Sequence, residues 1–357
     1  MKSLLIINPG STSTKIAVFR GAEAIFTETI SHSAEELSPY INIIAQKDFR
    51  QSVVSAALSA AGFDGSSFQG LIGIGGLLRS VESGVYEISD DMLADLTAAR
   101  YGEHAANLGA VLVRGLADAW NVPGYIADPI TVDEMQDVAR ISGHPLLPRY
   151  GRTHTLNHKR VAMSAAAELG KSYEDCRFVV AHLGGGVSIG AHCGGRIIDS
   201  TTSRGEGAFS MDRSGQLNSW ELAKLCFSGK YEKQEVLKML NGNGGVSAYL
   251  NTRDFRDVER MMKEGNPAAY QVFHGLAYQV SKEIASMAAV LCGRLDGIIL
   301  TGGIAFSQAF VDLVTERAGF LGRIILKPGE EEMESLAYYL NAALRGALPV
   351  KTYEAQR

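Results

Sequence analysis

The stretch that decides the fold reads Leu4-Leu5-Ile6-Ile7-Asn8-Pro9-Gly10-Ser11-Thr12-Ser13-Thr14-Lys15-Ile16-Ala17-Val18-Phe19. An apolar run meets a tight turn of small hydroxyl residues, and an alternating pattern then resumes, which predicts a strand–turn–strand hairpin. The turn supplies backbone N–H groups, hydroxyl side chains and one lysine, which are donors that can hold a phosphate. We therefore predict a phosphate-binding turn with contacts from Asn8, Gly10, Ser11, Ser13 and Lys15.

Two more glycine-rich turns follow apolar runs. One lies in Val179-Val180-Ala181-His182-Leu183-Gly184-Gly185-Gly186-Val187-Ser188-Ile189-Gly190, and the other in Ile298-Ile299-Leu300-Thr301-Gly302-Gly303-Ile304-Ala305. A single glycine turn carries little weight, but three of them spread along the chain predict a nucleotide held between two domains. The backbone candidates for holding it are Gly184, Gly185, Gly186, Gly302 and Gly303.

The composition is that of a globular protein without a general attraction for anions. The chain has 357 residues, a length that suits two domains better than a single core. Its net charge of −5 favours neither nucleic acid nor an anionic membrane as a partner, so an anionic substrate must be held by a local cluster of cations. No apolar run approaches the ~20 residues needed to span a bilayer.

The cysteines and the first residues indicate a cytoplasmic enzyme. The four cysteines show no C-x-x-C spacing, which argues against a zinc or redox motif, and their scatter is typical of reduced thiols. A strand is expected directly after Met1-Lys2-Ser3, which leaves no room for a signal peptide.

The hydrophobic pattern predicts an α/β protein of two domains. Strands are expected over 1–30, 70–75, 125–128 and 178–198, and a strand–turn–helix unit from Gly297. Helices are expected over 34–62, 90–120 with an interruption at 101–104, 154–169, 219–294 with a break at 241–245, and 331–345. Residues 178–198 echo the architecture of 4–19 without repeating its sequence. With a crossover at 142–153, the domains are predicted as 1–150 plus about 330–357, and about 151–329.

Taken together, these features resemble the acetate/butyrate kinase family, which belongs to the actin-like ATPase superfamily. The resemblance runs from Ile6 to Ala337, and its details are closer to the butyrate kinase branch than to acetate kinase. The motifs are Asn-Pro-Gly-Ser-Thr-Ser-Thr-Lys at 8–15, Tyr-Gly-Glu-His-Ala-Ala-Asn-Leu-Gly at 101–109, Asp-Pro-Ile-Thr-Val-Asp-Glu-Met at 128–135, His-Leu-Gly-Gly-Gly-Val-Ser at 182–188 and Pro-Gly-Glu-Glu-Glu-Met-Glu at 328–334.

The resemblance implies a two-domain actin-like ATPase fold of the ribonuclease H-like type. In that fold a βββαβαβα core, with a five-stranded sheet, is duplicated, and the active site lies in the cleft between the domains. The implied reaction is the reversible phosphorylation of a short-chain fatty acid by ATP to an acyl phosphate and ADP, with butyrate or another C3–C5 or branched acid as acceptor. Mg²⁺ is the implied metal, with Mn²⁺ as an alternative ion, and a homodimer or higher homo-oligomer is implied as well.

The resemblance also assigns roles to cationic and imidazole side chains. Arg213 is expected to neutralise the repulsion between a carboxylate and a triphosphate, and arginines in this role are worth ~10³-fold or more in analogous reactions. His154 opens a predicted helix, where an anion is attracted, and is expected to contact the γ-phosphate. His182 is expected to align the phosphoryl group, and His104 is a further catalytic candidate. The alternatives are a turn arginine at the surface and ordinary hydrogen-bonded histidines.

Two carboxylates complete the implied site. Asp128 ends a short apolar strand, where an unpaired charge is costly, and the resemblance makes it a catalytic carboxylate that positions a basic partner or the metal. The alternative is an N-cap for a helix that starts at Pro129. Glu332 matches a metal-linked glutamate, with Asn8 as a second metal contact, although neighbouring glutamates leave the register open by one and a helix-capping charge is the alternative. Lys15 is either a ligand or a solvent-facing lysine.

One position departs from the family pattern. The arginine that meets the substrate carboxylate in the family corresponds to Ile74 here, and the candidates to replace it are Arg79, Arg149 and Arg152. The acyl tail is expected near Leu77, Leu78 and Thr153. Acetate kinase has a phenylalanine at the last of these positions, so the smaller residue leaves room for a longer acid. Because one methylene is worth only ~1–3 kcal/mol, the preferred acid stays open.

Other functions stay open at this point. An acetate or propionate kinase of the same family is one alternative. A sugar kinase of the superfamily would need a general base for a hydroxyl group, whereas a carboxylate is already ionised at pH 7. A nucleotide-switched binding protein would need a further binding or regulatory module, and the chain has no spare segment for one.

Overall fold

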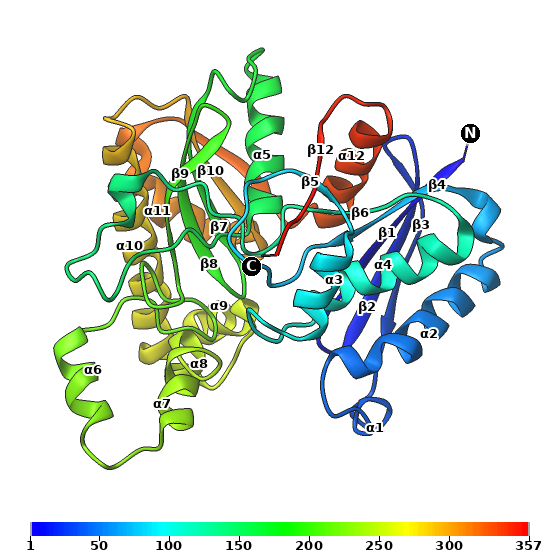
Figure 1. Ribbon diagram of the computed structural model, residues 1–357. Helices are drawn as coiled ribbons and strands as arrows, with labels where there is room; N and C mark the ends of the chain where they lie inside the picture. The colour runs from blue at the N-terminus through cyan, green and yellow to red at the C-terminus, as the bar shows by residue number, and fades with distance from the viewer. Residues whose placement is uncertain (1, 356–357) are drawn as a thin grey trace. The chain divides into compact units, whose positions relative to one another are not determined.

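The computed structural model describes residues 2–355. These residues pack into two compact units, which are described here one at a time. The first unit contains the residues up to Asp133 together with those from Glu331 onward, and the second runs from Glu134 to Glu330. Each unit has its own sheet with helices packed on it (Figure 1).

The first unit is built on a seven-stranded sheet with the order β12-β5-β6-β4-β1-β2-β3. Its strands are β1 (Ser3–Pro9), β2 (Ser13–Arg20), β3 (Glu23–Ser31), β4 (Phe68–Ile74), β5 (Val85–Glu87), β6 (Gly124–Ala127) and β12 (Val350–Lys351). β1 pairs antiparallel with β2 and parallel with β4, and β2 pairs antiparallel with β3. The expected core of five strands is present as β3-β2-β1-β4-β6, and the short strands β5 and β12 extend the sheet beyond β6.

Helices cover both faces of this sheet. They are α1 (Ala34–Leu37), α2 (Lys47–Ala60), α3 (Asp90–Thr97), α4 (Asn107–Trp120) and α12 (Glu332–Leu344). Gly70 and Gly73 point to opposite faces of β4, since strand residues alternate. A Cβ at Gly70 would lie 3.1 Å from Leu344 of α12, and one at Gly73 would lie 2.8 Å from the backbone of Gly109 in α4. Glycine at both positions therefore lets one helix approach each face.

The second unit has a five-stranded sheet with the order β11-β10-β7-β8-β9. Its strands are β7 (Arg177–Leu183), β8 (Val187–Cys193), β9 (Arg196–Thr202), β10 (Gly297–Gly302) and β11 (Ile324–Pro328). The path β9-β8-β7-β10-β11 follows the same order as β3-β2-β1-β4-β6 in the first unit, with the same parallel and antiparallel pairings. The predicted echo between 4–19 and 178–198 is thus confirmed at the level of topology.

The helices of the second unit are α5 (Thr155–Glu168), α6 (Ser219–Cys226), α7 (Lys233–Leu240), α8 (Gly245–Leu250), α9 (Phe255–Lys263), α10 (Pro267–Val290) and α11 (Gln308–Ala318). Of these, α5 packs on β7 and β10, and α10 packs on β7, β8 and β9. The odd-numbered residues Val179 and Ala181 of β7 pack in one core cluster with α10. The even-numbered Phe178 and Val180 pack in another cluster with α5. The side chains that face α5 matter for the site described below.

Two sequence-based boundaries differ from the structure. The helix predicted over 34–62 is interrupted after α1, because Pro39 cannot continue it and disfavours helix at the residue before it. The first unit ends at Asp133, earlier than the crossover predicted at 142–153. Residues after that point are tied into the second unit by the Glu134–Lys159 ion pair at 2.9 Å.

Candidate active site

The predicted phosphate turn of the first unit connects β1 to β2 and is supported from behind by Arg50 of α2. This arginine is fully buried. Its guanidinium donates hydrogen bonds to the carbonyl oxygens of Gly10 and Ser13, both at 2.8 Å, and of Ser11 at 3.0 Å. Burial lowers the pKa of Arg50 from its ordinary value, and the three carbonyl oxygens supply the partners that this buried group needs.

The backbone N–H groups of the turn point away from this arginine. The remaining carbonyl, of Thr12, accepts the N–H of His32 at 2.8 Å. In a planar trans peptide the N–H points opposite to the C=O, so the N–H groups of Ser11 and Thr12 are directed away from Arg50. Consecutive N–H groups exposed in this way form an anion-binding nest. The geometry therefore suits a phosphate on the side of the turn opposite Arg50.

The two predicted metal contacts lie together in the first unit. Nδ2 of Asn8 donates to Oε2 of Glu332 at 2.6 Å, and Glu332 is the first residue of α12. Glu332 is thus the member of its acidic cluster that contacts Asn8. Lys15 lies directly opposite Asn8 in the β1–β2 ladder, and its side chain is exposed.

The donor chemistry of this pair fits Mg²⁺. Among residues 2–355 no group of three or more His, Cys, Asp or Glu side chains is arranged to hold a metal ion. Mg²⁺, however, is commonly bound through one or two carboxylates, with substrate phosphates and water as the other ligands. A carboxylate from Glu332 and an amide oxygen from Asn8, beside a phosphate turn, suit that pattern.

Asp128 is a buried anchor point of the first unit. Its carboxylate accepts hydrogen bonds from the Ser83 hydroxyl at 2.7 Å, the Gly84 N–H at 2.9 Å and the Tyr339 hydroxyl at 2.6 Å. Its backbone has a φ of +39°, a conformation that costs energy for any residue except glycine. The N-cap alternative is wrong, because a turn rather than a helix follows Pro129. Its carboxylate therefore ties a loop to α12 through neutral donors.

The other candidates of the first unit are more scattered. His104 is exposed, and its Nδ1 accepts the backbone N–H of Ala106 at 3.1 Å. Ile74 is the last residue of β4. Leu78 is buried in the main hydrophobic cluster of the unit, whereas Leu77 is only partly buried, and their assignment to an acyl pocket stays a prediction.

In the second unit, three predicted residues meet at the turn between β7 and β8. The rings of His154 and His182 are stacked with their centroids 3.9 Å apart. Nδ1 of His182 lies 2.9 Å from Oδ1 of Asn157, and its Nε2 lies 3.2 Å from the Glu330 carboxylate. A Cβ at Gly186 would lie 2.6 Å from Nη1 of Arg213 and 3.2 Å from Cε1 of His154. Glycine at this position lets both side chains approach the turn.

The electrostatics of this turn favour an anion. Burial, together with the nearby His182 and Arg213, lowers the pKa of His154 well below its ordinary value, so this imidazole is neutral at pH 7. Desolvation and the neighbouring Arg152 and Arg213 lower the pKa of Arg204. Nε of Arg213 is buried and makes no hydrogen bond with the described residues. Arginines that repel one another in this way are stabilised when an anion binds between them.

The three arginines that could replace the family arginine, whose position Ile74 occupies here, differ in their surroundings. Arg149 is engaged by Asp199 and Glu206, both at 3.1 Å, and by backbone carbonyls. Arg79, in the first unit, donates to the carbonyl of Glu354 at 2.7 Å. Arg152 is exposed and makes no hydrogen bond or ion pair with any residue in 2–355. Of the three, Arg152 has its guanidinium free for a ligand.

At two of the predicted glycine positions, neither the backbone conformation nor a neighbouring atom requires glycine. A Cβ at Gly185 or at Gly303 would have no atom within 4 Å, and neither backbone has a positive φ. Gly302 differs, because its φ is +88° and a Cβ would lie 2.4 Å from the carbonyl oxygen of Leu183. Gly302 is therefore required by the turn, whereas Gly185 and Gly303 leave open space beside it.

Comparison with known proteins identifies the family. The profile of the Acetokinase family matches residues 141–331. Butyrate kinase 2 of Clostridium acetobutylicum is 46% identical over 352 residues, which are 98% of this chain and 99% of that protein. The chain belongs to the acetokinase family. A probable butyrate kinase of Listeria innocua is 44% identical over 351 residues, covering 98% of this chain and 99% of that protein.

Solved structures of acetokinases share the fold. Acetate kinase of Porphyromonas gingivalis matches with a TM-score of 0.79 at 18% identity, covering 96% of this chain and 100% of that one. A propionate kinase of Francisella tularensis matches with a TM-score of 0.74, also at 18% identity, over 96% of this chain and 100% of that one. The predicted actin-like ATPase fold is confirmed, and this likeness concerns the fold alone. Within residues 2–355, no helix has the length and apolar character needed to cross a membrane.

Sequence reasoning missed several residues that support this acetokinase site. Arg50 could have been found, because it lies on the stripe with Val54 and Leu58 that α2 buries, where a cation is out of place. His158 follows His154 by four residues and so lies on the same side of α5. Ser188 ends the motif at 182–188 but was given no role, and His192 and Tyr173 carried no signal in the sequence alone.

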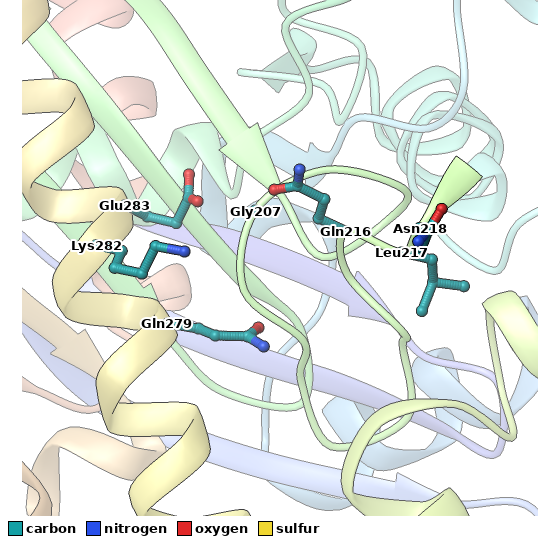
Figure 2. Close-up of a pocket in the computed structure, with 7 residues that line it drawn as sticks. All are labelled: Gly207, Gln216, Leu217, Asn218, Gln279, Lys282 and Glu283. Carbon is teal, nitrogen blue, oxygen red and sulfur yellow. The ribbon is translucent and has the colours of Figure 1, made fainter. Parts of the chain in front are cut away.

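Figure 2 shows a cavity of about 390 Å³ in the second unit. It is lined by Gly207, Gln216, Leu217, Asn218, Gln279, Lys282 and Glu283. Some of its polar groups already have partners, since Glu283 accepts from the Thr201 hydroxyl at 3.0 Å and Gln279 from the Phe209 N–H at 3.2 Å. None of the predicted site residues lines this cavity.

Proposed function

We propose that this acetokinase transfers the γ-phosphoryl group of ATP to the carboxylate of a short-chain fatty acid, with butyrate as the preferred acid, and catalyses the reverse reaction as well. The observation that carries the proposal is the group around Gly186, where His154 and the guanidinium of Arg213 lie against a glycine turn and Nε of Arg213, 3.8 Å from Asp212, makes no hydrogen bond with the described residues. The names of its relatives, butyrate kinase 2 and probable butyrate kinase, support butyrate as the acid.

The proposed chemistry is direct in-line transfer. A carboxylate oxygen attacks the γ-phosphorus, the bond from phosphorus to the β–γ bridging oxygen breaks, and ADP leaves. The acid is ionised at neutral pH, so no general base is required. Catalysis then consists of positioning and of neutralising charge on the transferred group, the tasks given to Arg213 and His154.

The remaining residues are proposed to bind and orient the substrates. The N–H groups of the turn at Ser11 and Thr12 hold phosphate oxygens, and Gly185 and Gly303 allow the nucleotide to approach the backbone. Arg152 is proposed to meet the acid's carboxylate in place of the family arginine. Mg²⁺, held through Glu332 and Asn8, would neutralise phosphate charge when bound. The function needs contributions from both units, and the predicted cleft, the oligomeric state and the cytoplasmic location stay predictions.

A hydroxamate-trapping assay tests the proposal. Purified protein is incubated with ATP, Mg²⁺ and hydroxylamine in the presence of each linear acid from acetate to hexanoate, and of isobutyrate. We expect acyl hydroxamate with butyrate and its neighbours in chain length, and none when the acid is omitted. A maximum at acetate or propionate would replace butyrate as the acid, and ADP formation without any hydroxamate would contradict the proposal as a whole.

A further inference from the structure

A line of hydrogen-bonded side chains lies behind His154 in the second unit. We call it the imidazole relay, and its members in order are Ser188, His158, His192 and Tyr173. Oγ of Ser188 lies 2.8 Å from Nδ1 of His154 and 2.9 Å from Nε2 of His158. Nδ1 of His158 lies 3.2 Å from Nε2 of His192, whose Nδ1 lies 2.7 Å from the Tyr173 hydroxyl. The relay thus connects a buried phenol to the candidate phosphate contact without interruption.

The fold assembles this relay between one helix and one strand. His154 is the N-cap residue of α5, and His158 lies one turn further on. Ser188 and His192 are four residues apart in β8 and so point to the same face, with Gly190 between them. A Cβ at Gly190 would make an ordinary contact of 3.5 Å with Nδ1 of His158, which places that ring beside the strand at this position.

The relay is buried and has no task in the transfer itself. The exposed fractions of Ser188, His158, His192 and Tyr173 are 1%, 0%, 0% and 6%. Burying four polar side chains costs free energy unless each one is hydrogen-bonded, and each of these four is. Because the proposed reaction moves no proton, the relay is not needed as a proton path. Its effect on His154 is the remaining way in which it can influence the reaction.

The imidazoles of the relay are neutral at pH 7. Burial and the neighbouring His182 lower the pKa of His158 to about 3. Burial and nearby positive charge lower the pKa values of His154 and His192 well below their ordinary value. A neutral imidazole donates through one nitrogen and accepts through the other. Through His158 and His192, the direction of one hydrogen bond therefore fixes the direction of the next.

A pattern in which His154 and His158 both donate to Oγ of Ser188 would leave the hydroxyl proton without an acceptor in the relay, whereas two other directions use every proton. In the first, Tyr173 donates to His192, every ring carries its proton on Nε2, and Ser188 donates to Nδ1 of His154. In the second, every bond is reversed and every ring carries its proton on Nδ1. A phenol, with an ordinary pKa of about 10, is a much stronger proton donor than a neutral imidazole N–H, so the Tyr173 hydroxyl favours the first direction.

We propose that the imidazole relay fixes the tautomer of His154, so that Nε2 carries the proton and acts as a hydrogen-bond donor to the transferred phosphoryl group. The opposite tautomer would present a lone pair to the phosphate oxygens and repel them. The relay residues are positioning residues that act through His154. The inference rests on the proposed function for the identity of the group that His154 meets, but not for the tautomer itself.

The tautomers can be measured in the ligand-free wild-type protein. Long-range ¹H–¹⁵N correlation spectra of ¹⁵N-histidine-labelled protein at pH 7 distinguish a protonated from an unprotonated ring nitrogen, and single His→Gln variants assign the signals. We expect His154, His158 and His192 to be neutral with the proton on Nε2. A proton on Nδ1 of His154, or a charged ring at any of the three positions, overturns the proposal.

Variants then connect the tautomer to the rate. Ser188→Ala breaks the relay where it meets His154, and we expect a mixture of His154 tautomers and a kcat lowered roughly tenfold or more, with little change in the KM for ATP. Ser188→Thr keeps the hydroxyl and is expected to restore both readouts. Ser281→Ala is the matched control, because Ser281 is a buried serine of the same unit that bonds only to the backbone of α10 at 2.8 Å.

The outcomes separate this inference from the proposed function. An unchanged tautomer or an unchanged kcat in Ser188→Ala overturns the relay. If the variant does not fold, the wild-type spectra still decide. Protein with the expected tautomers but without acyl hydroxamate would contradict the proposed reaction and leave the relay's effect on His154 in place.

Discussion

In the first unit the turn between β1 and β2 lies over the guanidinium of Arg50, whereas in the second unit the turn between β7 and β8 lies beside neutral imidazoles. The five core strands of the two sheets have the same order and pairing, so topology places a glycine turn at the same point in each. The side chains that lie behind the two turns nevertheless differ in charge. One is held by a buried charge bonded to carbonyl oxygens, and the other by rings whose protons must be correctly placed.

This contrast separates holding a phosphate from transferring it. A cation behind the first turn orients backbone N–H groups and adds a fixed positive potential, which suits the binding of a group that does not react. In the second unit, Arg213 is proposed to supply charge directly, and His154 to supply a donor whose tautomer is set by its neighbours. Variants in the first unit should therefore act mainly on KM, and variants in the second mainly on kcat.

The largest expected effect is that of Arg213→Ala. We expect kcat to fall by about 10³-fold or more while the KM for ATP changes little, because the arginine acts on charge that develops during transfer. Steady-state kinetics with butyrate measure both parameters. Lys224→Ala, which removes an exposed cation of α6, is the control and should leave both unchanged. A near-normal kcat in Arg213→Ala would remove this residue from its role.

Arg50→Met is expected to act on the first turn. Three carbonyl oxygens lose their donor, at ~1 kcal/mol each, so the free energy of unfolding should fall by about 3 kcal/mol. The KM for ATP should rise roughly tenfold, which corresponds to ~1.4 kcal/mol. Urea unfolding and steady-state kinetics measure the two effects. Arg20→Met, at the exposed end of the same hairpin, serves as the control, and a normal KM for ATP in Arg50→Met would contradict the role given to this arginine.

Acid is expected to destabilise the second unit through its histidines. Above about pH 6.5 these rings are neutral in both the folded and the unfolded protein. Below it the unfolded chain takes up protons, whereas His158 stays neutral in the folded protein until about pH 3, so stability falls as the pH falls. Each such ring contributes ~1.4 kcal/mol per pH unit in this window.

The urea midpoint measured from pH 7.5 down to pH 5 tests this dependence. His154 and His192 have lowered pKa values as well, while His32 is the corresponding ring of the first unit. Carboxylates such as Asp296 have pKa values below 3.8 and contribute only at lower pH. His158→Gln should flatten the slope by one histidine's share, and a midpoint that does not move with pH would contradict the neutral state assigned to these rings.

The smallest expected effect compares two adjacent glycines. Gly303→Ala should leave the thermal midpoint nearly unchanged, because its Cβ meets open space, yet raise the KM for ATP a few-fold if the nucleotide uses that space. Gly302→Ala should instead lower the midpoint, since its positive φ and the carbonyl of Leu183 leave no room for a methyl group. Equal losses of stability in the two variants would contradict the prediction that only position 302 requires glycine for folding.

The patterns that sequence reasoning handled well were local. The hairpins, the glycine turns and the helix that opens at His154 follow from short-range periodicity, and their bounds fall within a few residues of those observed. The interruption after α1 was missed, although Pro39 is a helix-breaking residue that predicts it. The two extra strands of the first sheet were missed because each is only two or three residues long.

What the sequence could not provide were partners distant along the chain. The contact of Asn8 with Glu332 spans 324 positions, and only the family resemblance suggested it. For a buried apolar residue such as Leu78, apolar character alone does not distinguish a place in a pocket from a place in the core. The imidazole relay joins α5, β8 and the loop before β7, and no spacing rule connects those segments before the sheet is known.

The placement of α12 has a consequence for how the protein is made. This helix and β12 belong to the first unit although they follow the whole of the second unit in the chain. A ribosome therefore releases every residue of the second unit before it releases the helix that covers Gly70 of β4. The nascent second unit is able to fold while one apolar face of the earlier sheet still awaits its cover, which is the stage at which that sheet is most exposed to aggregation or to chaperones.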